Sequence, residues 1–419
     1  MRSAFGIFLL CLGAYAQQFD DRIRKETEAI KPNLVQMRRD FARHPELSNR
    51  EEWTGKYIAE QLRKLGFTDI RTGVARHGVV ATLTGGKPGP VVAWRADMDG
   101  LPVQDIGDKP YKSQIAGVKH ACGHDSHMAI ALGAAEVLTR MKADLPGTVK
   151  FIFQPAEEGA PEGEAGGAGL MIKEGALENP RPRAIFGLHI WSQAPSGKIH
   201  YTPGAAMASA ESFTVSIRGK RAHAATPHLS IDPIVIAAQC VTSLQTIRSR
   251  RVDPLEPIVL TFGSIHGGNR NNIIPEEVTL EGTLRTLNEQ TKESVHGMIR
   301  QTLEGCTSES GAKFDFRWSA MQYPVTYNDP DLTRHNLGAL QRTLGGDNVV
   351  LSRPTLGGED FSMYQKIIPG FFWFLGTANP AKGITGAHHT AEFDIDEDVL
   401  PLGVRAAVAQ LTDYLGQSK

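Results

Sequence analysis

Apolar and polar residues alternate along this chain with two different periods. Helical spacing over residues 21–43 and 51–66 predicts two amphipathic helices, the second of them closed by Gly66. Short apolar runs predict buried strands, and longer apolar-rich runs predict helices. The strands are expected at Val79–Leu83, Val91–Trp94, Val149–Phe153, Ala184–Leu188 and Phe371–Leu375, and the helices at Met128–Met141 and Leu400–Leu415. Strands that alternate with helices indicate a layered α/β domain, which we expect to contain a mixed sheet.

The middle of the chain follows a pattern of its own. Its elements come in the order β-α-β-β-α-β, which is typical of a ferredoxin-like α+β unit. They are expected at Phe213–Ile217, Pro233–Ile247, Pro257–Phe262, Val278–Leu284, Glu289–Leu303 and Phe314–Trp318. We therefore expect residues 203–317 to be a domain inserted into the α/β domain, which comprises residues 17–202 and 318–419.

The first 16 residues have the pattern of an export signal. Arg2 precedes the apolar run Phe5–Leu12, and Ala14-Tyr15-Ala16 fits the small-x-small cleavage rule. The run is too short to span a bilayer, and the alternative is a buried N-terminal helix. We expect cleavage after Ala16 and a mature protein that is secreted or periplasmic.

Charge and cysteine content narrow the range of partners. The chain has 45 basic and 46 acidic side chains and no long block of one sign. This balance argues against nucleic acid or an anionic membrane as the main partner. Loss of the leader removes Cys11 and leaves three of the four cysteines, too few for a disulfide framework. Cys240 and Cys306 could pair or stay free.

Polar side chains follow three of the predicted strands. Asp97, the pair Glu157-Glu158 and His189 each come just after an apolar run. In open α/β sheets, ligands bind at the carboxyl ends of the strands. We therefore expect the sheet to deliver these groups to one edge.

A cysteine and a histidine two residues apart precede the helix predicted from Met128. On an extended backbone, Cys122 and His124 would point to the same side. A thiolate with an imidazole suits zinc or another borderline-soft divalent ion. Asp125 or Ser126 could cap the helix, and the alternative interpretation is such a cap beside a buried cysteine.

Two adjacent glutamates and three further histidines complete the candidate chemistry. Glu157 and Glu158 would face opposite ways on an extended segment, so one could bind metal while the other acts as general base. The alternative is a solvated acidic loop. His189 alone is more often a core histidine, and the pair His388-His389 is equally ambiguous. Together with the cysteine and histidine before the helix, these groups supply five candidate ligands, enough for two ions with open positions for water and substrate.

A series of ordered motifs covers nearly the whole chain after the leader. The motifs are His44–Ser48, Arg95–Pro102, Cys122–Asp125, Pro155–Gly159, Gly187–His189, Gly219–Ala225, Asn272–Pro275, Gly282–Arg285 and Gly358–Phe361. In them the chain resembles the amidohydrolase branch of the di-metal aminoacylase and carboxypeptidase superfamily. Relatives in that branch include hippurate hydrolase, N-acyl amino acid amidohydrolases and plant auxin-conjugate hydrolases.

The resemblance implies a site for two divalent ions, which could be Zn, Mn, Co or Ni. The implied ligands are Cys122, His124, Glu158, His189 and a histidine near the C-terminus. The family pattern places that histidine four residues before an aromatic residue that precedes an acidic one, and His389 with Phe393 and Asp394 fits this spacing. Where the wider superfamily has a histidine ligand this chain has Arg95, and where it has a bridging aspartate this chain has Cys122, as the amidohydrolase branch does.

Five more side chains acquire roles from the resemblance. Glu157 would be the catalytic base, and Asp97 would orient a metal ligand. In the family the inserted domain both dimerises and acts as a lid, and its histidine, here His223, would stabilise the oxyanion in the partner's active site. Asn272 and Arg285 would hold the carbonyl and the carboxylate of the substrate.

The expected activity is hydrolysis of the amide bond of N-acyl amino acids or related small amide conjugates by a homodimer. Glu157 would take a proton from a water that the ions activate, and would later protonate the leaving amine. A first alternative is a dipeptidase or carboxypeptidase that acts on small peptides. A second is a non-catalytic binding protein on the same scaffold, which the presence of Glu157 and every candidate ligand argues against.

Overall fold

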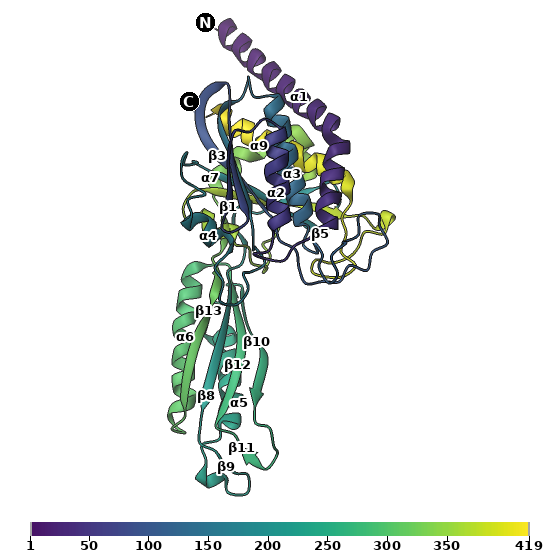
Figure 1. Cartoon of the computed structure of the whole chain (residues 1–419). Helices are drawn as coiled ribbons and strands as arrows, with labels where there is room; N and C mark the ends of the chain where they lie inside the picture. The colour runs from purple at the N-terminus through teal and green to yellow at the C-terminus, as the bar shows by residue number, and fades with distance from the viewer. Residues whose placement is uncertain (1, 418–419) are drawn as a thin grey trace. The chain divides into compact units, whose positions relative to one another are not determined.

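The structure is a computed structural model that describes residues 2–417, with side chains described for residues 19–416. The chain divides into two compact units, whose elements are labelled in Figure 1. Unit 1 comprises the chain up to Gly204, Tyr327–Arg353 and the chain from Met363 onward, and unit 2 comprises Ala205–Thr326 and Pro354–Ser362. The expected leader lies outside the described side chains and stays a prediction.

Unit 1 is built, within the described residues, on an eight-stranded mixed sheet, which confirms the α/β class expected from the sequence. The strands lie in the order β1-β2-β4-β3-β5-β16-β6-β15. They are β1 (Asp69–Val74), β2 (Gly78–Thr84), β3 (Lys87–Asp97), β4 (Pro146–Gln154), β5 (Ile185–Pro195), β6 (Ile199–Tyr201), β15 (Val349–Leu351) and β16 (Gly370–Ala378). Strands β4, β3, β5 and β16 are parallel neighbours, so their carboxyl ends share one edge of the sheet.

Helices α1, α3 and α9 of unit 1 pack against one another (Figure 1). Helix α3 is apolar around most of its circumference and is buried almost throughout. Close packing requires Gly133, because a Cβ atom there would lie 2.8 Å from Val404 Cγ2 and 3.0 Å from Leu34 Cδ1. The helices are α1 (Arg2–Arg43), α2 (Glu52–Lys64), α3 (His124–Arg140), α4 (Gly167–Lys173), α7 (Pro330–Leu344), α8 (Phe361–Gln365) and α9 (Leu400–Gln417). Among the described residues, every helix is too short or too polar to cross a membrane.

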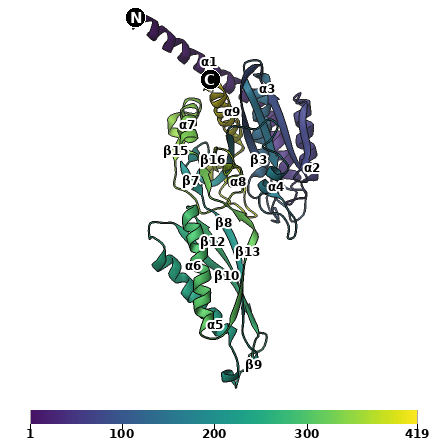
Figure 2. The same ribbon diagram turned by 90° about the vertical axis from the view of Figure 1, so that its left-hand side faces the viewer.

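Unit 2 is a four-stranded antiparallel sheet with two helices on one face (Figure 2). Its order β8-α5-β10-β12-α6-β13 is the predicted ferredoxin-like sequence of elements, and the strands lie in the order β10-β12-β8-β13. The bounds are β8 (Ala210–Arg218), α5 (Pro233–Thr246), β10 (Ile258–Gly267), β12 (Glu277–Thr286), α6 (Glu289–Ser308) and β13 (Lys313–Tyr323). Short strands also occur at β7 (Gly204–Met207), β9 (Ala222–His223), β11 (Ile273–Ile274) and β14 (Thr326–Asn328). Asp232 and Asn288 cap α5 and α6 by accepting backbone N–H groups of the first turn.

The insertion ends later than the sequence predicted. We expected it to end in the middle of β13, but after a shift in register this strand pairs with β8 again at Gln322 and Tyr323, and residues 318–326 belong to unit 2. The segment Pro354–Ser362 also belongs to unit 2, where Thr355 exchanges backbone hydrogen bonds with Ala206 and Ala208. Such a brief pairing leaves no hydrophobic period in the sequence, which is why it was missed.

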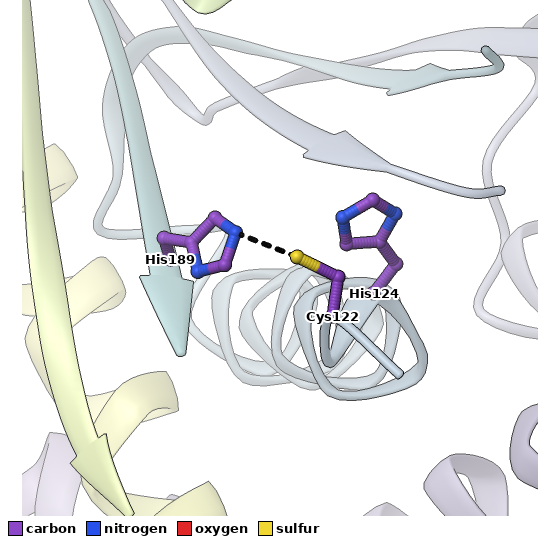
Figure 3. A group of neighbouring side chains, drawn as sticks. All are labelled: Cys122, His124 and His189. Atoms are coloured by element: carbon purple, nitrogen blue, oxygen red, sulfur yellow. Dashed lines mark hydrogen bonds between the residues drawn. The ribbon is translucent and has the colours of Figure 1, made fainter. Parts of the chain in front are cut away.

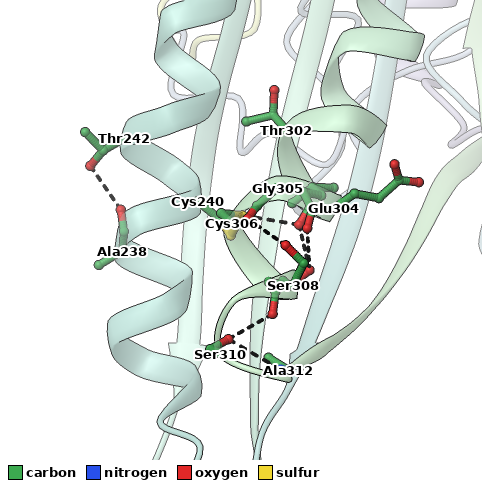
Figure 4. Close-up of a disulfide and its surroundings, with 12 residues drawn as sticks. Ala238, Cys240, Thr242, Thr302, Glu304, Gly305, Cys306, Ser308, Ser310 and Ala312 are labelled. Carbon is green, nitrogen blue, oxygen red and sulfur yellow. Dashed lines mark hydrogen bonds between the residues drawn. A yellow bond between two sulfur atoms is a disulfide. The ribbon is translucent and has the colours of Figure 1, made fainter.

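Cys240 of α5 and Cys306 of α6 form a disulfide within unit 2, which settles the alternative left open by the sequence (Figure 4). It joins positions 66 residues apart and therefore restricts the unfolded chain. We expect the double variant Cys240→Ala/Cys306→Ala to lose about 2–4 kcal/mol of unfolding free energy, measured by urea denaturation. A reductant should lower the wild type to the level of the double variant and leave the variant unchanged. A wild type that resists urea equally well after complete reduction would contradict this expectation.

Candidate metal centre

Three adjacent parallel strands of unit 1 carry candidate residues to one edge of the sheet. Asp97 at the end of β3 is level with Gln154 at the end of β4, and Arg95 is level with Gly187 of β5. His189 follows two residues later in β5. The sheet therefore places these strand ends side by side, as the alternation of strands and helices predicts.

The segment before α3 brings Cys122 and His124 together, although not on an extended backbone. Gly123 has a φ of 93° and takes the N-cap position, so His124 already lies in the first turn of the helix. A Cβ at Gly123 would also lie 3.1 Å from Ile190 Cβ. The helix thus starts four residues earlier than predicted, and Gly123, rather than Asp125 or Ser126, caps it.

Cys122 lies between histidines that come from distant parts of the chain. Its Sγ is 3.4 Å from His189 Nε2 and 3.2 Å from His389 Nε2. Figure 3 shows Cys122, His124 and His189 close together, and His189 lies within β5. Burial and the charges of Glu158 and Glu157 raise the pKa of the Cys122 thiol well above its usual range. A cation must therefore stabilise any thiolate formed here.

The histidine near the C-terminus that meets this cluster is His389. Its Nε2 lies 3.2 Å from Glu158 Oε1, in addition to its contact with Cys122. His388 points elsewhere, and its Nε2 accepts a hydrogen bond from the Ser192 backbone N–H at 3.0 Å. The geometry thus separates the two neighbours that the sequence alone left ambiguous.

Glu157 and Glu158 occupy a turn rather than the extended segment we expected. Both carboxylates face His124, whose Nε2 lies 3.8 Å from Glu157 Oε2 and 4.0 Å from Glu158 Oε1. The turn is held by Asp99, whose carboxylate accepts the backbone N–H groups of Glu157 at 3.1 Å and Glu158 at 3.0 Å. Burial raises the pKa of Asp99, but bonds from His124, Ser48 and the turn outweigh it and hold that pKa below its usual value.

Asp99 and Glu51 are two supporting residues that the sequence reasoning missed. His124 Nδ1 lies 2.8 Å from the backbone carbonyl of Asp99, so that Nε2 faces the carboxylates of Glu157 and Glu158. Glu51 Oε1 accepts the N–H of Ala156 at 2.8 Å, next to the turn. Burial and the nearby charge of Asp99 raise the pKa of Glu51 to about 8. Asp99 lies in the same motif as Asp97, Arg95–Pro102, and its place there was the sequence signal that could have identified it.

Asp97 acts on the centre less directly than expected. Its carboxylate binds His127 Nδ1 at 2.5 Å and Arg95 Nη1 at 2.6 Å, whereas His124 Nδ1 lies 3.8 Å away. His127 Nε2 in turn accepts the backbone N–H of Ile190 at 2.8 Å. Asp97 therefore fixes His127, and through it the β5 backbone beside His189, rather than bonding a metal ligand itself.

The donor atoms fit a pair of divalent ions. Atoms of Cys122, His124 and His189 lie within 4.8 Å of one another, and so do those of Cys122, Glu158 and His389, so Cys122 is common to both groups. His124 Nε2 is buried and has no hydrogen-bond partner among the described residues. Despite burial, Asp97 and Asp99 raise the pKa of His124 to about 10, which marks the pocket as attractive to positive charge. Thiolate, imidazole and carboxylate together suit zinc and similar ions.

The three other candidate residues, His223, Asn272 and Arg285, belong to unit 2. His223 pairs with Ile273, so Asn272 lies beside it, beyond the end of β12 that starts at Glu277. Arg285 lies toward the other end of β12. It is eight residues from Glu277 along an extended strand, which corresponds to roughly 26 Å. One chain therefore does not offer Asn272 and Arg285 to the same small substrate, so the roles that the resemblance implies for them stay predictions for a dimer.

A mixed α/β sheet whose strand ends gather thiolate, imidazole and paired carboxylates defines a metal-dependent hydrolase. The chain belongs to peptidase family M20/M25/M40, whose model matches residues 93–413. It is 38% identical over 387 residues to thermostable carboxypeptidase 2 of Saccharolobus solfataricus, which covers 92% of this chain and 96% of that protein. It is also 38% identical over 373 residues to N-acetylcysteine deacetylase of Bacillus subtilis, covering 89% and 94%.

A solved structure shares the whole architecture. The YXEP protein of Bacillus subtilis, described as a dinuclear metal binding peptidase of the M20 family, has a TM-score of 0.80 and 34% sequence identity. The similarity covers 93% of this chain and 99% of that one. The chain is thus a metal-dependent hydrolase that acts on amide bonds.

Proposed function

We propose that this chain hydrolyses the amide bond of N-acyl amino acids or related small conjugates with two divalent ions, held by Cys122, His124, Glu158, His189 and His389. The observation that carries the proposal is the position of Cys122, which is common to two groups of ligand atoms beside Glu157. The similarity to N-acetylcysteine deacetylase, whose name describes removal of an acyl group from an amino acid, supports this substrate class.

Glu157 and Glu158 take different parts in this proposal. Bound ions would polarise the amide carbonyl and acidify a water molecule. Glu157, nearly buried and facing His124, is placed to accept a proton from water and to pass it to the leaving amine. Glu158 faces His389 at 3.2 Å and serves as a ligand.

Cleavage of small peptides is the second candidate function. It is favoured by the 38% identity to a thermostable carboxypeptidase over nearly the whole of both chains. The two candidates differ in the group on the far side of the scissile amide, which is a simple acyl group in one and an amino acid residue in the other.

A substrate panel distinguishes these candidates. The purified chain would be assayed with acetyl, benzoyl and longer N-acyl derivatives of several amino acids, and with matched dipeptides that share the same C-terminal residue. We expect kcat/KM to be higher for the N-acyl amino acids. Higher values for the dipeptides would favour the peptidase, and full activity after chelation of metal would exclude both.

We also propose export and homodimerisation. The Cys240–Cys306 disulfide supports export, because disulfides persist in oxidising compartments.

The edge strand β10 supports the proposed dimer, because it carries an exposed Ile265 and offers unpaired backbone groups to a second chain. In such a dimer His223 would stabilise the oxyanion in the partner's active site, as the resemblance implies. Mass and light scattering of the exported protein would test cleavage after Ala16 and the dimer together.

A further inference from the structure

A buried arginine of α1 joins the two segments that carry Cys122 and His389. Arg38 is 4% exposed, and its Nε lies 2.8 Å from Asp125, the residue after His124. Its Nη2 and Nη1 lie 3.3 Å from Asp394 and 3.4 Å from Glu397, on the segment that follows His389. Burial works to lower the pKa of Arg38, but these carboxylates outweigh it and raise that pKa, so the guanidinium stays charged.

An aromatic ring fixes the plane of this guanidinium. Arg38 Cζ lies 4.6 Å from the centre of the Tyr111 ring, and the Tyr111 hydroxyl donates to Asp394 at 2.9 Å. The planar fork of arginine suits such an arrangement, since it bonds several carboxylates at once while stacking on a ring. A lysine could keep the charge but not this geometry.

A lysine ties the same two segments at a second point. Lys119, three residues before Cys122, donates from Nζ to the carbonyl of Ala391 at 2.7 Å, and Ala391 lies two residues after His389. Lys119 also bonds Asp105 at 3.1 Å. In addition, the backbone N–H of His389 donates to Ala121 O at 2.9 Å. Contacts before and after Cys122 therefore join its segment to the residues that follow His389.

We propose that Arg38 and Lys119 are positioning residues that fix the separation of Cys122 and His389, and so set the affinity for the ion held by Cys122, Glu158 and His389. The proposal rests on the metal centre proposed above. Partners outside the ligand shell orient ligands, and their loss commonly weakens metal binding 10–100-fold. Arg38 and Lys119 line a cavity of about 250 Å³, which water can enter when a side chain is shortened, so the variants are expected to fold.

The test is a zinc titration of the metal-free full chain against a competing chelator. We expect wild type to bind two ions, and Arg38→Lys and Lys119→Met each to weaken one of them about 10–100-fold without changing the other. Added zinc should then restore kcat in both variants. The matched control is Lys150→Met, because the Lys150 amine is also buried and donates to a backbone carbonyl, that of Glu178.

The control variant is expected to lower Tm while both zinc affinities stay within about twofold of wild type. Variants at Arg38 and Lys119 that lower Tm in the same way but bind both ions like wild type would overturn the proposal. Equal weakening of both ions would also overturn it, because that result indicates general loss of structure. A wild type that binds fewer than two ions would instead overturn the proposed metal centre on which it rests.

Discussion

Replacing Glu157 by glutamine is expected to lower kcat by about 10²–10⁴-fold while both metal ions stay bound, because the amide keeps the shape of the side chain but cannot accept the proton. Glu157 is 5% exposed and faces His124, whereas Glu158, the proposed ligand, lies 3.2 Å from His389. The loss should therefore fall on kcat rather than on metal content. Steady-state kinetics and elemental analysis of the same sample measure the two quantities.

The control for this variant is Glu162→Gln, which removes an exposed carboxylate from the loop that follows the same turn. It should retain the wild-type kcat. Undiminished turnover by Glu157→Gln at full metal loading would show that another group serves as the base.

Replacing Cys122 by alanine is expected to abolish activity through loss of metal rather than loss of fold. The sulfur lies 3.4 Å from His189 and 3.2 Å from His389, and it belongs to both groups of ligand atoms. Both ions should therefore bind more weakly, and kcat/KM should fall by more than about 100-fold. This loss exceeds the one that follows mutation of a residue that only orients a ligand from outside the ligand shell. Metal per chain, measured after dialysis, is the direct readout.

The double variant Cys240→Ala/Cys306→Ala is the control for cysteine loss, because this pair lies in unit 2 and forms the disulfide. It should keep two ions per chain and lose only stability. Wild-type metal content in Cys122→Ala would contradict the assignment of the thiolate as a ligand common to both ions.

Much of the order of elements was predictable from sequence, because most long elements carry their own hydrophobic period, although the strand β1 and the 15-residue helix α7 were not predicted. The buried strands and the ferredoxin-like order of unit 2 appear in the structure where the apolar runs occur. The three-residue strands β6 and β15 were missed, since so short a segment has no period to recognise. The end of the insertion was missed for a related reason, because β13 continues beyond its apolar run and its register shifts after Trp318.

The identity of the candidate ligands was easier to predict than the local backbone that aims them. The extended geometry assumed for Cys122 and His124 was wrong because Gly123 adopts a left-handed conformation and starts the helix at once. The turn at Glu157 was likewise unforeseen, since it depends on Asp99, whose carboxylate meets backbone N–H groups 58 residues away in the chain. Contacts of that kind leave no spacing rule in a single sequence, and Arg38 belongs to the same class.

The central claim is that amide hydrolysis depends on two divalent ions that both contact Cys122. The most direct test is to titrate the metal-free chain with zinc, manganese, cobalt or nickel while following cleavage of an N-acyl amino acid. We expect activity to appear as metal binds, to reach its maximum at two ions per chain and to disappear again on chelation. Full activity in the metal-free chain, or a chain that is saturated with two ions yet cleaves no amide, would contradict it.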